Sequence, residues 1–284
     1  MTQEKKVILC ADDFGISPSI SESICRLAEM KRISATSVMV VYEDGDLYHK
    51  SLLDYAAHLD IGLHFVLTEA TPISPSEKIK SITGKDGNFF KMGQLIKRAW
   101  LGFIDSTEVL AELAAQYDKF IKIFGIEPNF IDGHHNVNQY PVVGDAVIKF
   151  IKNKGLGEGI YLRNTAHRWT SILKGEDLFK TAFISTPGLI FKKKLLANEL
   201  RTNKSFGGIY NLNKSDNFQK RIEGFLILAE SKNSIIMIHP GRADTFLAQR
   251  DSFCRGREIE KQVLLQDSFP ELLEVHNITL SKFE

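Results

Sequence analysis

Short apolar runs that end in an aspartate or a histidine recur along the chain, and they constrain its fold more than any other feature. Each run is rich in β-branched residues and is followed by a polar cluster and then by a stretch with helical spacing. Runs bounded in this way are typical of buried strands. The predicted strands are Val7–Ala11, Thr36–Val41, Ile61–Phe65, Phe130–Ile131, Ile160–Leu162, Ser234–Ile238 and Ile278–Leu280.

Helices are predicted between these strands. Ser17 is a suitable N-cap for a helix over Pro18–Met30, with proline at its first turn. Apolar residues keep helical spacing over Ser106–Phe124, and Gly125 ends that segment. Two further helices are predicted at Ala146–Lys154 and Asn217–Ser231.

Strands and helices that alternate along one chain predict a parallel α/β sheet. For a chain of 284 residues with this many strands, a (β/α) barrel is the first choice, and an open doubly wound sheet is the second. No repeat or linker divides the sequence, so we expect one domain over residues 1–284. Ser74–Phe90 and Thr165–Lys214 have weaker periodicity, and we expect them to be loop insertions beside a site.

The composition narrows the choice of partners and compartment. With 36 basic and 35 acidic residues, no strong net field favours a nucleic acid or a membrane as partner. Three cysteines without a close pair fit a reducing compartment. The apolar run near the N-terminus is too short for a signal peptide. We therefore expect a cytoplasmic protein with a small-molecule substrate, and the sequence leaves open whether it forms a homo-oligomer.

The polar residues that end the runs form the candidate site. Asp12 and Asp13 follow the first strand, and His64, His134 and His239 end three others. In barrels and doubly wound sheets, active sites lie at the carboxyl ends of the strands. We therefore expect these side chains to converge.

The adjacent aspartates suggest a metal. Two neighbouring carboxylates at the end of a buried strand resist ionising together, and a divalent cation relieves this repulsion. The second carboxylate can then act as a general base toward water. A turn and helix-cap role for Asp12 and Asp13 is the alternative, and this segment alone does not decide between them.

The histidines extend the metal hypothesis. A single buried histidine such as His64 or His239 is more often structural, but the tandem His134-His135 is harder to explain in that way. One aspartate and two histidines would make a three-ligand site with room for water, as in catalytic zinc centres. His239 is the candidate general acid, because an unperturbed imidazole titrates near neutral pH.

Two further polar residues are candidates for substrate binding. Arg163 follows a predicted strand and could hold a substrate or orient an acid, with a surface salt bridge as the alternative. Glu69 could contact a substrate or cap the next segment. The aromatic candidates for stacking on a sugar are Phe89, Phe90, Trp100, Trp169, Phe206 and Tyr210, for each of which core packing is the alternative.

Several pieces of the chain, in order, resemble the YdjC-like carbohydrate deacetylases, a family that includes chitooligosaccharide deacetylases. They are ADDFGIS at 11–17, GLHFVLTEATP at 62–72, the stretch at 112–141 that contains DGHH, IIMIHPG at 235–241 and RGREIEKQVL at 255–264. The resemblance implies a distorted (β/α) barrel of the TIM type and hydrolysis of an N-acetyl group from an amino sugar or short oligosaccharide, with Mg²⁺ or Zn²⁺ as cofactor.

The resemblance also assigns roles by position. It implies that Asp13, His64 and His134 are the metal ligands, that Asp12 is the base, and that His239 belongs to the late His-Pro-Gly motif. The family pattern commonly continues with further histidines, where this chain has Asn136 and Asn138. Another metal-dependent amide or ester hydrolase and a catalytically silent sugar-binding protein are the alternative functions.

Overall fold

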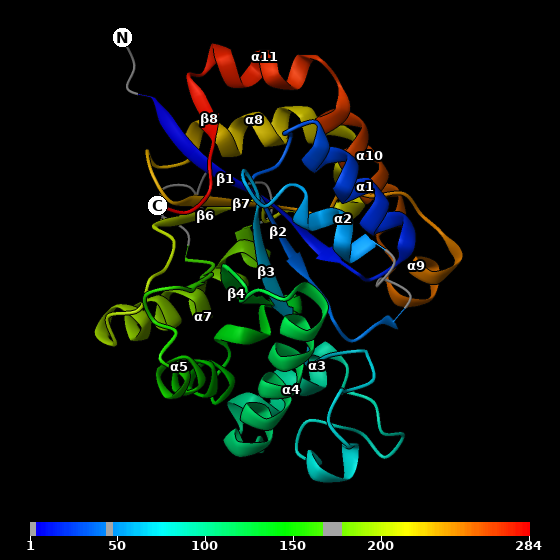
Figure 1. Ribbon diagram of the computed structural model, residues 1–284, viewed down its shortest axis with the longest axis vertical. Helices are drawn as coiled ribbons and strands as arrows, with labels where there is room; N and C mark the ends of the chain where they lie inside the picture. The colour runs from blue at the N-terminus through cyan, green and yellow to red at the C-terminus, as the bar shows by residue number, and fades with distance from the viewer. Residues whose placement is uncertain (1–3, 44–47, 167–177) are drawn as a thin grey trace.

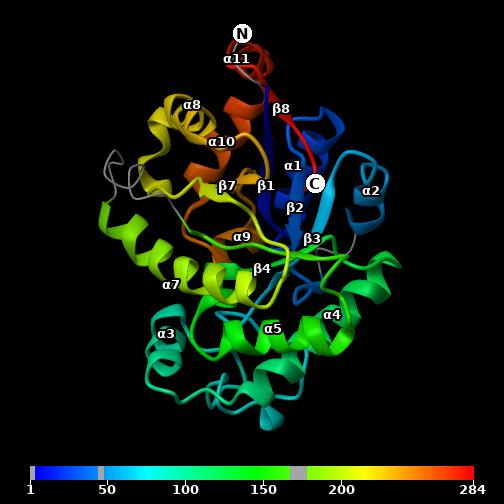
Figure 2. The same ribbon diagram turned by 90° about the vertical axis from the view of Figure 1, so that its left-hand side faces the viewer.

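The chain forms a curled parallel sheet with helices around it (Figures 1 and 2). The computed structural model describes residues 4–43, 48–166 and 178–284. The strands are β1 Lys5–Phe14, β2 Ala35–Val38, β3 Asp60–Phe65, β4 Phe130–Gly133, β5 Tyr161–Leu162, β6 Ser205–Gly207, β7 Ser234–Ile238 and β8 Ile278–Leu280. The helices are α1 Pro18–Glu29, α2 His49–Leu53, α3 Met92–Trp100, α4 Ser106–Phe124, α5 Val143–Lys154, α7 Leu178–Ala197, α8 Phe218–Leu228, α9 Thr245–Arg250, α10 Cys254–Leu265 and α11 Ser268–Val275, with short 3₁₀ helices η2 Ser76–Lys78, η3 His134–Gln139 and η4 Leu212–Asn217.

The strand order is that of a distorted (β/α) barrel. The sheet runs β5-β4-β3-β2-β1-β7-β6, with β8 paired to the first residues of β1, and the pairs between these strands are parallel. A parallel bridge from Leu162 to Thr202, just before β6, draws the two ends of the sheet together. The prediction of a barrel is therefore confirmed. All seven predicted strands are present, and β6 was missed.

Helix α4 begins and ends where the sequence predicts. The Asp105 side chain accepts a hydrogen bond from the Thr107 backbone N–H at the start, and Gly125 ends the helix in the left-handed conformation with φ +69°. Its buried face includes Val109, Tyr117 and Phe120, which pack into the main hydrophobic core. This is the single apolar stripe that makes an amphipathic helix recognisable from sequence.

The expectation that Thr165–Lys214 is a loop insertion is wrong for much of its described part, which contains α7 and β6. Helix α7 includes Pro187 within its length and has exposed apolar side chains such as Phe183 and Ile190 as well as the buried Phe191. Because its apolar residues do not lie on one side, the helical period is weak in the sequence. Ser74–Phe90, by contrast, is a loop that contains the one-turn η2 and an isolated antiparallel bridge between Thr83 and Phe89.

The helices cover the outside of the sheet, which leaves its carboxyl-terminal edge for a site. In Figure 1, α1 and α2 lie on one side of β1–β3 and α5 and α7 lie on the other. None of the helices in the described part of the chain is both long and apolar enough to cross a bilayer.

Candidate active site and metal centre

The residues predicted from separate strand ends line one pocket. A cavity of about 430 Å³ is bordered by the seven candidate residues Asp12, Asp13, His64, Glu69, His134, Arg163 and His239. This volume is within the usual range for small-molecule sites. The predicted convergence of these side chains is therefore confirmed, whereas their individual roles stay predictions.

A β-bulge at the end of β1 presents both aspartates. Between the pairs Ala11–Thr36 and Phe14–Val38, Asp12 and Asp13 on β1 stand opposite one residue of β2, Ser37. Asp13 has φ +70°, a left-handed conformation that is unusual for a residue other than glycine. Bulges re-aim side chains at the ends of strands. Here the bulge allows two consecutive side chains to border the same pocket.

Gly15 makes this turn feasible. Its φ is +91°, and a Cβ atom at this position would lie 2.5 Å from the Met39 carbonyl oxygen. The chain then enters α1 through Ser17, whose hydroxyl accepts a hydrogen bond from the Ile20 backbone N–H. The N-cap predicted from the sequence is therefore confirmed.

Asp13, His64 and His134 form a compact set of metal-ligand atoms. One Asp13 oxygen lies 3.2 Å from His64 Nε2 and 3.1 Å from His134 Nδ1. The three ligand atoms lie within 4.8 Å of one another. Burial alone would raise the pKa of Asp13, but the Arg257 guanidinium and the two histidines hold it well below its usual value. Asp13 is therefore an ionised carboxylate ready to bind a cation.

The His64 ring nitrogen that does not face Asp13, Nδ1, contacts Asp132 and Ser37. His64 and Asp132 face each other on the parallel strands β3 and β4, and His64 Nδ1 lies 2.6 Å from an Asp132 oxygen and 2.9 Å from the Ser37 hydroxyl. Burial would lower the pKa of His64, but Asp132 and Asp13 raise it to about 10. A carboxylate behind a ligating histidine fixes the ring orientation, as is usual at metal sites.

Asp12 belongs to a second, closed cluster. Arg163 donates to both Asp12 oxygens at 2.6 Å and lies 2.8 Å from Asp132. Arg163 is 2% exposed, so the surface salt bridge considered from the sequence is wrong. Burial would raise the pKa of Asp12, but the Arg163 ion pair and hydrogen bonds outweigh it and lower the pKa below its usual value. Asp12 is therefore an oriented and ionised carboxylate.

Arg257 and Glu260 of α10 are site residues that the sequence reasoning missed. Arg257 pairs with Asp13 and Asp251 at 2.5 Å each. Glu260 accepts hydrogen bonds from the Tyr210 hydroxyl and, at 2.5 Å, from the His239 backbone N–H. Both side chains are buried, and buried charges in proteins are nearly always paired. Their position in RGREIEKQVL was the only signal, because nothing in that segment distinguishes inward from outward charges.

His239 differs electrostatically from the unperturbed imidazole that the sequence suggests. Burial lowers the pKa of His239 to about 4, and Arg257 acts in the same direction against the attraction of Asp13. The ring is therefore neutral at neutral pH. Nearby, burial raises the pKa of Glu260 to about 7.

The turn that follows DGHH contains Asn136 and Asn138, the two positions where the family pattern commonly has histidines. His135 and Asn136 both have positive φ, and the His135 ring lies 3.9 Å from that of His134 between ring centres. Asn136 borders the pocket. Asn138 is buried, and its side-chain amide donates to the Arg163 carbonyl oxygen at 2.9 Å. The asparagine at 138 therefore supports the turn that positions Arg163.

The aromatic candidates differ in their surroundings. Phe89 and Phe206 are buried, so core packing describes them better than stacking on a sugar. Tyr210 is also buried but borders the pocket. Trp100 is 53% exposed. Trp169 lies outside the described residues.

The residues present fit a divalent cation. Their donor set is one carboxylate and two imidazoles, one of which is oriented by a second carboxylate, and they border a pocket with room for a substrate. A neighbouring group of Cys10, Asp12 and Asp132 does not fit one, because the Arg163 guanidinium binds both Asp12 oxygens and also pairs with Asp132. Arg257, in contrast, pairs with only one Asp13 oxygen and leaves the oxygen near the histidines available.

The fold and this donor set define a distorted (β/α) barrel protein with an Asp-His-His cluster at the strand ends that could hold a metal ion. The model of the YdjC-like protein family matches residues 6–275, so the chain belongs to the YdjC-like family. Its curated relatives include chitooligosaccharide deacetylases of Yersinia enterocolitica, 30% identical over 154 residues, and of Yersinia pestis, 32% identical over 155 residues. Each match covers 54% of this chain and 58% of the relative.

A solved structure shows the same fold over the whole chain. A putative cellobiose-phosphate cleavage protein from Enterococcus faecalis superimposes with a TM-score of 0.74 at 23% identity. The match covers 99% of this chain and 98% of that one. At this identity the likeness supports the fold and nothing finer.

Proposed function

We propose that the protein is a metal-dependent hydrolase that removes the N-acetyl group from an amino sugar or a short N-acetylated oligosaccharide. The observation that carries the proposal is the pairing of Asp13, His64 and His134 at one pocket with Asp12, a separate ionised carboxylate. Membership of the YdjC-like family and relatives named chitooligosaccharide deacetylases support an N-acetylated sugar as the substrate.

Asp13, His64 and His134 would hold the cation, Zn²⁺ or Mg²⁺. Two imidazoles favour zinc or another transition ion, whereas the family resemblance also allows magnesium. When bound there, such a cation lowers the pKa of water and stabilises negative charge on a carbonyl oxygen. Arg257 would keep Asp13 ionised and fixed for this task.

Asp12 is proposed to accept the proton from the attacking water. Because Arg163 binds both of its oxygens, the carboxylate has one orientation, and its lowered pKa keeps it ionised at neutral pH. We propose that Arg163 positions Asp12 rather than binds the substrate, since its guanidinium pairs with Asp12 and Asp132. Glu69, which is exposed at the pocket, remains the proposed contact for sugar hydroxyls.

His239 is proposed to deliver a proton to the departing amine nitrogen. Water adds across the C–N bond, so acetate and a free amine form, and one proton of the water ends on nitrogen. A ring that is neutral at rest has to take up that proton during the reaction before it gives it away. His239 would therefore act as one step of a relay rather than as a stored imidazolium.

Acetate release tests this proposal. Purified protein loaded with Zn²⁺ or Mg²⁺ is incubated with N-acetylglucosamine and its oligomers, and acetate is measured with and without a chelator. We expect release that the chelator abolishes and the metal restores. Phosphate release from generic phosphoesters without acetate would favour another metal-dependent hydrolase. Sugar binding without any release would favour a silent binding protein.

A further inference from the structure

An open groove continues from the catalytic pocket. It has a volume of about 340 Å³ and is lined by Trp100, Tyr140, Ala182, Phe183, Thr186 and Pro187. Tyr140 and Phe183 also line the catalytic pocket. The two spaces therefore meet at these two rings, and a ligand that extends past them from the catalytic pocket enters the groove.

Helix α3 runs from the catalytic pocket to the groove. Met92, its first residue, borders the catalytic pocket, and Trp100, its last residue, borders the groove. A helix of this length spans roughly 12 Å at about 1.5 Å per residue. A ligand that contacts both ends is therefore longer than one sugar ring.

The lining of the groove suits the apolar face of a sugar. Trp100 is 53% exposed and Phe183 is 57% exposed, a large apolar area for side chains on two facing helices. Among the described residues that line the groove, none is charged. Aromatic rings of this kind bind the C–H face of a neutral ring while its hydroxyls stay in water. A phosphate or a carboxylate would find no counter-charge on this lining.

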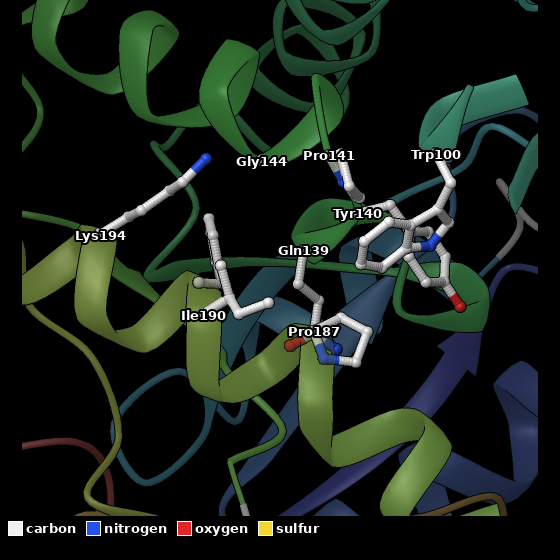
Figure 3. Close-up of a pocket in the computed structure, with 9 residues that line it drawn as sticks. Trp100, Gln139, Tyr140, Pro141, Gly144, Pro187, Ile190 and Lys194 are labelled. Atoms are coloured by element: carbon white, nitrogen blue, oxygen red, sulfur yellow. The ribbon is translucent and has the colours of Figure 1, made fainter. Parts of the chain in front are cut away.

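The floor of the groove is fixed to the catalytic turn. Tyr140 is buried, and its hydroxyl donates to the His135 carbonyl oxygen at 3.3 Å, next to the proposed ligand His134. In Figure 3 the Trp100 indole lies next to the Tyr140 ring, with Pro187 of α7 beside them. The groove is therefore positioned relative to the metal site by direct contacts.

A smaller pocket behind the groove does not compete for the ligand. It shares Trp100, Tyr140 and Pro187 with the groove and has a volume of about 50 Å³ (Figure 3). The rest of its lining consists of Gln139, Pro141, Gly144, Ile190, Phe191 and Lys194. Such a space takes a few water molecules rather than a sugar ring. The Lys194 ammonium, moreover, pairs with Asp145 at 2.6 Å.

We propose that the groove formed by Trp100, Tyr140 and Phe183 is a second carbohydrate subsite, which binds the sugar ring next to the one whose acetamide reaches the metal site. The inference rests on the proposed function and adds that the preferred substrate is an oligosaccharide of at least two rings. Trp100 sets this preference by stacking on the second ring.

Kinetics of a Trp100 variant test the preference. The ratio of kcat/KM for the trisaccharide of N-acetylglucosamine to that for the monosaccharide is expected to fall about tenfold in Trp100→Ala, the loss of one aromatic contact. Trp100→Phe keeps a ring and should restore part of the ratio. Phe103→Ala is the control, because Phe103 is 60% exposed but lines neither space, and its ratio should not change. An unchanged ratio in Trp100→Ala overturns the proposal.

A binding measurement separates this proposal from the proposed function. The chain has two tryptophans, so Trp169→Phe leaves Trp100 as the only one, and Asp12→Asn prevents turnover. Titration of this double variant with the trisaccharide should change the Trp100 fluorescence at a concentration about tenfold lower than the monosaccharide needs. If this fluorescence change occurs but the unsubstituted protein releases no acetate, the deacetylase function is contradicted and the subsite is supported. If acetate is released but the fluorescence does not change, the subsite is contradicted and the deacetylase function is supported.

Discussion

Two clusters of potential metal ligands meet at the end of β1, and they differ in what fills them. Asp13 with His64 and His134 borders the open pocket, whereas Asp12 with Asp132 and Cys10 encloses the Arg163 guanidinium. In both clusters the donor atoms lie within 4.8 Å of one another. Each cluster contains a buried arginine, but Arg257 pairs with only one Asp13 oxygen and leaves the other facing the two histidines, whereas Arg163 binds both Asp12 oxygens and Asp132. Ligand proximity alone therefore does not define a metal site.

The bulge at Asp13 creates this difference. It sends consecutive carboxylates to two neighbouring clusters, one of which can hold a cation while the other keeps a base fixed and ionised. Ser37, opposite the bulge, contacts both Asp12 and His64 and so joins the clusters. A residue with positive φ costs about 1–3 kcal/mol and persists where the surroundings enforce it, which fits a functional strand end.

The largest effect on turnover is expected when a proposed metal ligand of the open cluster is removed. His134→Ala is expected to reduce bound metal to a small fraction and acetate release by about 10³-fold or more, since several kcal/mol of charge stabilisation are lost. Metal analysis and turnover of the variant measure both effects. His276→Ala, which removes a histidine that pairs with Glu223, is the control. Full metal content in His134→Ala would remove His134 from the ligand set.

Loss of the Asp12 carboxylate from the closed cluster is expected to lower turnover without lowering the amount of bound metal. Asp12→Asn should lower turnover by about 10²–10⁴-fold, the usual contribution of a general base, while bound metal and sugar affinity persist. Asp118→Asn, an exposed carboxylate on α4, is the matched control. Turnover close to that of the unsubstituted protein would show that Asp12 is not the base.

Arg163 should matter for folding more than a surface arginine does. Arg163→Met leaves Asp12 and Asp132 buried without a counter-charge, and we expect a loss of about 3–5 kcal/mol in the free energy of unfolding. Arg255→Met, which breaks an exposed pair with Asp216, should cost about 1 kcal/mol or less. Urea unfolding of the two variants measures the contrast, and equal losses would contradict the closed-cluster description.

The affinity for the cation should depend on pH through His64. Asp132 and Asp13, against the effect of burial, raise the pKa of His64 to about 10, so in the absence of a cation the ring is protonated at neutral pH. A cation has to displace this proton, and its affinity therefore rises with pH up to that value. We expect about a tenfold gain per pH unit near neutrality. Calorimetric titrations at several pH values measure this dependence. An affinity that does not change with pH would show that cation binding displaces no proton from His64.

The sequence predicted every strand of the sheet except β6, and the convergence of the strand ends, because both depend on local patterns. An apolar run that stops at Asp12 or His64 marks the end of a buried strand wherever it occurs. The bulge at Asp13 could not be predicted, since it depends on the register between β1 and β2. Arg257 was missed for a similar reason: its segment is rich in charges, and only the tertiary contacts of α10, among them the ion pair of Arg257 with Asp13, determine which charge is buried.

Anomalous scattering from a crystal of the protein soaked with Mn²⁺ or Zn²⁺ would locate the cation and so decide which cluster binds it. We expect one strong peak in the open cluster, bound by Asp13, His64 and His134, with Arg163 still paired to Asp12. A peak between Cys10, Asp12 and Asp132, or no peak at either cluster in a fully soaked crystal, would contradict it.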